Sequence, residues 1–303
     1  MFKIFKQSNL LKNISNKKSY FVLLFIVFLH GFFTAMYQIF PYKQIMYFKN
    51  LFFHSSIIEL KRDIDKSVFT EANIQDLKNP SVYITYGQSN SANYGQIGYK
   101  VTKNTYMYFE NKIYKYEDPS LGATGNNGSV WGRVGDYLIS NNFSNSVIFF
   151  NAGYGGSTID KLLYGKRYDY FINNIVEAKK KFNKINAILI MQGEANHEEY
   201  YGSKKYIDQY NTLINLIKIH TDAPIIISLS SFCNNYIDKN LINKQKDVIK
   251  MHANVYEGPY TDSLIEKTYR LPDLCHMSEK GFDTLAKMWG DSIINNTSFN
   301  THQ

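Results

Sequence analysis

The chain has 303 residues, which is enough for one large domain with a full hydrophobic core or for two small ones. Its formal net charge is +8, but the lysines are scattered and form no basic stripe or nucleic-acid motif, which argues against a nucleic-acid-binding protein. The two cysteines, Cys233 and Cys275, have neither CxxC nor zinc-site spacing, so a disulfide and a pair of free thiols both remain open.

A long apolar run follows a lysine-rich stretch near the N-terminus. The run from Tyr20 to Phe40 contains no charged residue, and about twenty apolar residues suffice to cross a bilayer as a helix. By the positive-inside rule, lysines ahead of such a run place the N-terminus in the cytoplasm. The sequence therefore predicts a single-pass cell-membrane anchor with the rest of the chain extracytoplasmic, either periplasmic or extracellular. The lysines concerned are Lys3, Lys6, Lys12, Lys17 and Lys18.

Two other interpretations of this run remain open. A cleaved signal peptide needs a shorter apolar core and a small-x-small cleavage site, and Thr34-Ala35-Met36 is a poor one. A buried core helix fits the apolar run but not its lysine-rich flank. The expected organisation is a cytoplasmic N-terminus (1–19), a transmembrane anchor (20–40), a juxtamembrane stalk (41–79), a folded domain (80–297) and a short tail (298–303).

From residue 81 the chain alternates short apolar runs with amphipathic segments. Short apolar runs are typical of strands that are covered on both faces. Their alternation with helices predicts an α/β fold in which a parallel sheet lies between two helix layers. The predicted strands are Ser81–Tyr86, Ser146–Ala152, Asn186–Gln192 and Ala223–Ser231, and the predicted helices include Tyr170–Phe182, Lys204–His220 and Ser278–Asn295.

Polar and glycine-rich stretches follow these predicted strands. In parallel sheets, ligands bind outside the carboxyl ends of the strands, so these stretches are the candidate site. They are Gly87-Gln88-Ser89-Asn90 after the first strand, NAGYGGSTID with Gly155 and Gly156 after the second, MQGEAN from Met191 to Asn196 after the third, and Asp273 with His276 before the last helix.

Together these residues are the parts of a serine hydrolase. The hydroxyl of Ser89 needs a base within hydrogen-bond reach, and His276 can be that base. A carboxylate such as Asp273 can hold the imidazole in the right tautomer. A glycine-rich turn and a glutamine side chain can donate hydrogen bonds to an oxyanion. Each motif alone is also typical of an ordinary turn or helix cap, so the hypothesis depends on the set.

The pattern argues against the nucleophile elbow of α/β-hydrolases. That elbow is Gly-x-Ser-x-Gly and comes after several strands. Here Ser89 follows the first predicted strand, and Ser91 occupies the position of the second glycine.

Over roughly residues 80 to 295 the chain resembles the SGNH hydrolase superfamily. It resembles most closely the branch of sialate O-acetylesterases and of plant and bacterial carbohydrate acetylesterases. Ser91 stands in place of that branch's usual methionine, and Leu189 or Ile190 lies near the place of its tryptophan. These two differences affect how a substrate fits the site more than they affect the reaction chemistry. The matching blocks are Gly-Gln-Ser-Asn (Gly87 to Asn90), Gly-Gly-Ser-Thr (Gly155 to Thr158), Gln-Gly-Glu-x-Asn (Gln192 to Asn196), Asp-x-x-His (Asp273 and His276) and the segment SVWGRVGDYL (Ser129 to Leu138).

The resemblance implies a three-layer, flavodoxin-like α/β/α sandwich and a serine esterase that needs no metal or cofactor. It implies a catalytic set of Ser89, Asp273 and His276. The oxyanion would be held by the backbone N–H groups of Ser89 and Gly156 and by the side chain of Gln192. The supporting residues would be Gln88, Asn90, Gly155 and Glu194.

The expected activity is removal of O-acetyl groups from a glycan near the membrane. A glycan O-acetyltransferase remains an alternative, because a sugar hydroxyl can resolve the same acyl-enzyme in place of water. A non-catalytic glycan-binding domain is a second alternative, although the complete set of Ser89, Asp273 and His276 counts against it. A lipase or thioesterase is a third, and it would need a long apolar groove.

Overall fold

The computed structural model describes residues 25, 27–30, 66–77, 79–96, 98–197 and 205–297. The chain divides into two compact units, Met1–Ile58 and Glu59–Gln303. In the first unit only residues 25 and 27–30 are described, and they are helical. The predicted anchor and cytoplasmic N-terminus therefore lie largely outside the described residues. Within the described ranges, no helix combines the length and the apolar character needed to cross a membrane. The predicted tail, 298–303, also lies outside the described residues.

The second unit is built on an eight-stranded sheet with the order β1-β4-β3-β5-β2-β6-β7-β8. Strands β3, β5, β2, β6, β7 and β8 are neighbours in this order and run parallel. Strand β4 pairs antiparallel with β3, and β1 pairs antiparallel with β4. The bounds are β1 (Glu71–Ala72), β2 (Ser81–Gly87), β3 (Thr105–Phe109), β4 (Lys112–Lys115), β5 (Val147–Gly153), β6 (Ala187–Met191), β7 (Ile225–Leu229) and β8 (Val255–Tyr260).

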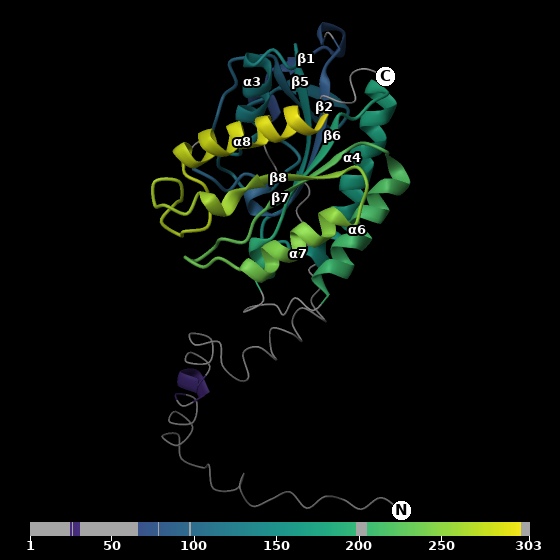
Figure 1. Ribbon diagram of the computed structural model, residues 1–303. Helices are drawn as coiled ribbons and strands as arrows, with labels where there is room; N and C mark the ends of the chain where they lie inside the picture. The colour runs from purple at the N-terminus through teal and green to yellow at the C-terminus, as the bar shows by residue number, and fades with distance from the viewer. Residues whose placement is uncertain are drawn as a thin grey trace, which may run out of the picture. The chain divides into compact units, whose positions relative to one another are not determined.

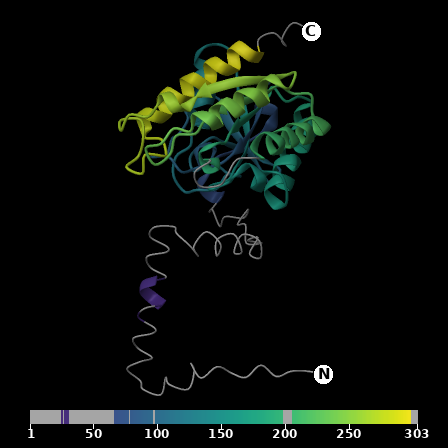
Figure 2. The same ribbon diagram turned by 60° about the horizontal axis from the view of Figure 1, so that its bottom comes forward.

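Helices cover both faces of this sheet (Figures 1 and 2). The helices α3 (Trp131–Ser140) and α8 (Glu279–Thr297) contribute to the core on one face. The core on the other face includes residues of α4 (Lys166–Phe182), α6 (Tyr206–His220) and α7 (Lys239–Lys250). Short 3-10 helices follow several strands, among them η4 (Ser89–Ser91), η5 (Ile159–Leu162), η6 (Glu194–Asn196) and η7 (Thr261–Ser263).

Alternate residues of the central strands enter opposite cores because side chains of a strand point to alternate faces. In β2, Ile84 packs in the α4–α6–α7 core, whereas Tyr83 packs in the α3–α8 core. Phe150 and Phe149 divide in the same way in β5. The central strands are thus apolar on both faces, which explains why they read as unbroken apolar runs in the sequence.

The prediction of an α/β fold with a mostly parallel sheet is confirmed. The four predicted strands correspond to β2, β5, β6 and β7, and the predicted helices correspond to α4, α6 and α8. Strands β3 and β4 were not predicted, nor were the edge strand β8 and helix α7. Strand β1 pairs with β4 through Glu71 and Ala72, so the sheet includes residues of the segment expected to form a stalk.

The order of connections places a topological switch at β2. After β2 the chain forms β3, β4 and β5 on one side of β2 and then crosses to form β6 on its other side. Gly87 at the end of β2 is in register with Gly153 of β5 and Met191 of β6, so the three carboxyl ends meet. Ligands of open α/β sheets bind at such a point.

Candidate active site

Ser89 lies in a tight turn at the carboxyl end of β2. The preceding Gly87 has φ +138°, and a Cβ there would lie 2.0 Å from the carbonyl oxygen of Met191. Only glycine permits this close approach, so the chain leaves the strand directly into η4. Ser89 is buried, and its backbone N–H donates no hydrogen bond within the described part of the chain, as is usual in the first turn of a helix.

A second unpaired donor lies in the turn after β5. Gly156 has φ +63°, in the left-handed region, and its N–H has no hydrogen-bond acceptor among the described residues. The N–H of the neighbouring Gly155 instead donates to Oγ1 of Thr124 at 2.8 Å. The structure therefore leaves unpaired two of the N–H groups that the sequence predicts as oxyanion donors.

His276 and Asp273 form a hydrogen-bonded pair in the loop before α8. Nδ1 of His276 lies 2.6 Å from Oδ2 of Asp273. Oδ1 of Asp273 accepts from the backbone N–H groups of Cys275 at 2.9 Å and His276 at 3.0 Å. Partial burial favours a higher pKa for Asp273, but these hydrogen bonds outweigh it, chiefly that of the imidazole, and hold the pKa below its ordinary value of 3.8. The carboxylate therefore stays ionised beside the imidazole.

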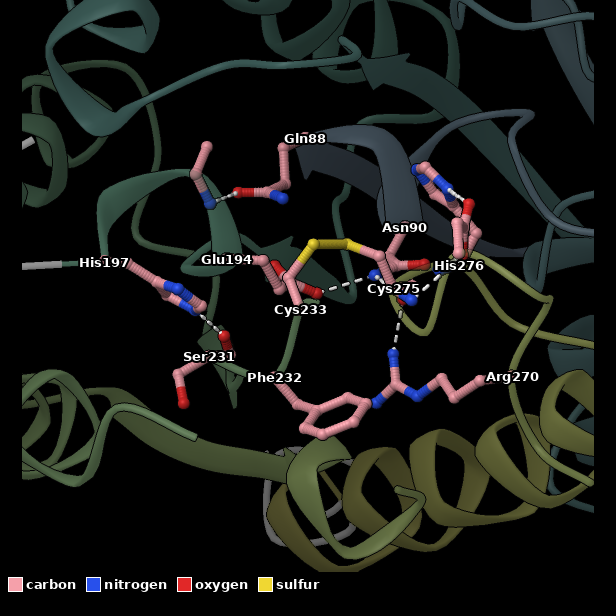
Figure 3. The surroundings of a disulfide bond; sticks show 12 residues. Gln88, Asn90, Glu194, His197, Ser231, Phe232, Cys233, Arg270, Cys275 and His276 are labelled. Atoms are coloured by element: carbon pink, nitrogen blue, oxygen red, sulfur yellow. Dashed lines mark hydrogen bonds and ion pairs between the residues drawn. A yellow bond between two sulfur atoms is a disulfide. The ribbon is translucent and has the colours of Figure 1, made fainter. Parts of the chain in front are cut away.

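Asn90 connects the turn of Ser89 to the loop of His276. Its Nδ2 donates to Oε1 of Glu194 at 2.6 Å and to the carbonyl oxygen of Cys275 at 3.3 Å (Figure 3). Asn90 directly follows Ser89, and Cys275 directly precedes His276, so this contact brings together segments that are 185 residues apart. No hydrogen bond joins Ser89 to His276 within the described ranges, and such bonds are often long before substrate binds.

The loop of His276 is held in place by a disulfide and an arginine. Cys275 is bonded to Cys233, which decides the alternative that the sequence left open in favour of a disulfide. Nη1 of Arg270 donates to the carbonyl oxygen of Cys275 at 2.6 Å. Arg270 is buried and also donates to the carbonyl oxygens of Leu264 and Thr261. No motif in the sequence pointed to Arg270, because its partners are backbone groups.

No motif in the sequence points to Tyr94 either. Its ring stacks on the imidazole of His276, with centroids 5.7 Å apart and planes inclined by 21°. A Cβ added at Gly155 would lie 2.3 Å from the Tyr94 hydroxyl, so the same side chain also lies against the turn after β5. Tyr94 thus contacts two of the predicted site segments.

Two glutamines at the strand ends hold the third block in position. Oε1 of Gln88 accepts from the backbone N–H groups of Gly193 at 3.2 Å and Ala195 at 3.0 Å. Gln192 is fully buried; its Nε2 donates to Oδ1 of Asn196 at 2.5 Å, and its Oε1 accepts from the hydroxyl of Tyr206 at 3.1 Å. The Gln192 amide is thus occupied inside the protein, and its role as an oxyanion donor stays a prediction.

Glu194 is a buried carboxyl group under the turn of Ser89. Burial raises its pKa above the ordinary 4.5, and this effect exceeds the opposing effects of its hydrogen bonds and of Arg270. Its Oε1 accepts from Asn90, whereas its Oε2 has no hydrogen-bond partner among the described residues. Glu194 therefore acts on the site through Asn90.

Comparison with known proteins agrees with this geometry. A family model described as carbohydrate esterase, sialic acid-specific acetylesterase matches residues 134–295. The chain belongs to this family. The resemblance seen in the sequence motifs is thereby confirmed, and the protein is a carbohydrate esterase, that is, a carboxylic ester hydrolase. No curated protein sequence matches the chain.

Solved structures are similar to this esterase at low sequence identity. A protein from Arabidopsis thaliana has 16% identity and a TM-score of 0.57 over 73% of this chain and 100% of that one. A carbohydrate acetylesterase from Xanthomonas citri has 13% identity and a TM-score of 0.48 over 74% of this chain and 57% of that one. The acetylxylan esterase Axe2 from Geobacillus stearothermophilus has 14% identity and a TM-score of 0.46 over 74% and 97%. The first of these supports the fold.

Proposed function

We propose that this esterase is membrane-anchored and extracytoplasmic and removes O-acetyl groups from a glycan, with Ser89, His276 and Asp273 as its catalytic residues. The observation that carries the proposal is the contact of Asn90 with the carbonyl of Cys275. It holds the predicted nucleophile turn against the predicted base loop, at the point where the carboxyl ends of β2, β5 and β6 meet.

In the acylation step, Oγ of Ser89 attacks the acetyl carbonyl carbon. Nε2 of His276 accepts the hydroxyl proton, while the ionised Asp273 stabilises the imidazolium through Nδ1. The negative charge that develops on the carbonyl oxygen is stabilised by the N–H groups of Ser89 and Gly156, which have no acceptor in the described part of the chain. His276 then protonates the sugar oxygen as the ester bond breaks.

In the deacylation step, water replaces the sugar. His276 takes a proton from the water as the water attacks the acetyl carbon, and gives it to Oγ of Ser89 as the ester bond to Ser89 breaks and acetate is released. Tyr94 covers one face of the imidazole and limits its rotation. An acetyltransferase would differ in this step, because a second sugar hydroxyl would take the place of water.

The extracytoplasmic location has two supports. Disulfides form and persist in oxidising compartments, so the Cys233–Cys275 bond favours an extracytoplasmic location. The lysine-rich flank ahead of the apolar run Tyr20–Phe40 favours a cytoplasmic N-terminus. A test is protease treatment of intact cells or spheroplasts: digestion of the esterase domain without lysis supports this orientation, and protection until lysis contradicts it.

The activity is tested with the full chain in detergent. Acetate release from p-nitrophenyl acetate and from an acetylated glycan is compared for the wild type, Ser89→Ala and Ser91→Ala. We expect Ser89→Ala to lose activity by a factor on the order of a thousand or more. Ser91 lies in the same turn, but its hydroxyl donates to the carbonyl of Tyr86, so Ser91→Ala is the matched control.

The other outcomes identify the alternatives. Equal rates for the wild type and Ser89→Ala would contradict Ser89 as the nucleophile, and rates at the uncatalysed background in both would favour a glycan-binding domain. Transfer of acetyl to an added sugar acceptor, in preference to water, would favour the acetyltransferase.

A further inference from the structure

The disulfide lies directly beside the proposed catalytic base. The two cysteines of the chain, Cys233 and Cys275, are bonded to each other, and Cys275 is the residue before His276 (Figure 3). A disulfide at this place restrains the backbone from which the imidazole projects. The bond also joins the loop after β7 to the loop before α8, and helix α7 and strand β8 lie between these loops in the sequence.

The Cys233 side of the bond is anchored in the core. The backbone N–H groups of Ser231 and Phe232 each donate to Oδ1 of Asp262 at 2.8 Å, and Asp262 is buried. The guanidinium carbon of Arg270 lies over the ring of Phe232, 5.0 Å from the ring centroid. The residues before Cys233 are therefore fixed by buried hydrogen bonds and packing.

On the His276 side, backbone hydrogen bonds hold the loop, among them Leu271 N–H to the carbonyl of His276 at 2.8 Å, but its reactive side chains are partly exposed. Leu274 has φ +52°, which is rare for a bulky residue because its Cβ crowds the backbone. The side chains of Asp273 and His276 are 45% and 23% exposed, so their hydrogen bond competes with water. The loop from Leu271 to Ser278 contains no helix or strand. The disulfide thus attaches a strained, partly exposed loop to a fixed one.

We propose that the Cys233–Cys275 disulfide positions His276, so that ester hydrolysis depends on the oxidised state of this pair; this inference rests on the proposed function. A thiol reductant attacks the bond, two electrons and two protons convert it to two thiols, and the reductant becomes a disulfide. Cys233 is the half-buried partner and the accessible point of attack. The esterase is then fully active only in an oxidising compartment.

The expected kinetic consequence is specific. After reduction, the carbonyl of Cys275 keeps its hydrogen bonds to Arg270 and Asn90, but the loop loses its covalent anchor. The imidazole then spends less time in the reactive geometry, and a displacement of about 1 Å can cost up to about a hundredfold in rate. The rate constant kcat falls, whereas KM changes little, because the turns that carry Ser89 and Gly156 are not altered.

The test uses the full chain in detergent and p-nitrophenyl acetate as substrate. We compare kcat and KM for the oxidised wild type, the wild type in dithiothreitol, the reoxidised wild type, and a Cys233→Ser/Cys275→Ser variant with and without dithiothreitol. We expect kcat to fall about tenfold or more on reduction, with KM within about twofold, and to recover on reoxidation. The double variant should match the reduced wild type and should not respond to dithiothreitol.

Two results would overturn the inference. One is a reduced wild type whose kcat stays within about twofold of the oxidised value, since a positioning role requires a larger change. The other is loss of activity that coincides with loss of the circular dichroism of the folded state at the assay temperature, because the bond would then be a general staple. Ser89→Ala, assayed in parallel, separates the two proposals. If that variant is active, the proposed function fails; if it is inactive and the cysteines have no effect, this inference alone fails.

Discussion

Nδ1 of His276 lies 2.6 Å from Oδ2 of Asp273, three residues earlier in the same loop. Replacing Asp273 with asparagine keeps the size of the side chain but removes the charge that orients the imidazole and stabilises its protonated form. We expect kcat/KM of Asp273→Asn to fall by a factor on the order of a thousand or more. The measurement is acetate release at neutral pH, and activity within about tenfold of the wild type would exclude the assigned role.

The same carboxylate makes stability depend on acidic pH. Its pKa is lowered in the folded state, so the stabilisation is present above the ordinary value of 3.8 and is lost as the pH falls through the folded pKa. We expect the free energy of unfolding of the wild type to decrease more steeply below about pH 4 than that of Asp273→Asn. Urea denaturation at a series of pH values measures both slopes, and parallel curves would contradict the assignment.

Glu194 gives the opposite pH dependence. Its pKa is raised by burial, so the folded state favours the protonated form, and stability is lost as the pH rises above the ordinary 4.5 through the folded pKa. The glutamine side chain of Glu194→Gln keeps an oxygen that can accept the hydrogen bond from Asn90, but the side chain cannot ionise. We expect it to remove this loss of stability between acidic and neutral pH, as measured by urea denaturation.

Glu194→Ala is the matched comparison for that variant. It removes the acceptor at 2.6 Å from Nδ2 of Asn90 and leaves a cavity under the nucleophile turn. We expect a loss of about 2 kcal/mol or more in the free energy of unfolding, together with lower activity. An alanine variant as stable and active as the glutamine variant would show that the Asn90 contact is dispensable.

The close contact of Gly155 with Tyr94 predicts a steric effect on catalysis. A Cβ at residue 155 would lie 2.3 Å from the Tyr94 hydroxyl, so Gly155→Ala must displace the ring that stacks on His276. We expect a loss of activity that exceeds the loss of stability. Truncation of the tyrosine in Gly155→Ala/Tyr94→Ala should recover stability, and recovery can be measured by thermal unfolding.

Gly165→Ala is the control for backbone strain. Gly165 has φ +75°, but a Cβ there would meet no atom within 4 Å, so its substitution costs backbone strain without a collision. With ψ −167° this backbone conformation is essentially restricted to glycine, so we expect about 1–3 kcal/mol of destabilisation and unchanged activity. Equal losses of activity in Gly155→Ala and Gly165→Ala would contradict the role assigned to the Tyr94 contact.

The sequence predicted the central strands well and the edge of the sheet poorly. Strands β2, β5, β6 and β7 are buried on both faces and so appear as apolar runs. Near the edge formed by β1, strands β3 and β4 are joined by Glu110 and Asn111, both with positive φ, in a short hairpin. Strand β1 is two residues long and forms by pairing with β4, and no local sequence pattern predicts this pairing.

By itself the sequence determined the family, the parallel α/β core and the residues placed at the strand ends, because hydrophobic periodicity and short motifs are local properties of a chain. The tertiary structure decided which of these residues meet. The contacts of Asn90 with Cys275, of Tyr94 with His276 and of Cys233 with Cys275 join segments that are far apart in the sequence. Such contacts depend on how the strands are ordered in the sheet, since that order alone places distant loops at one edge.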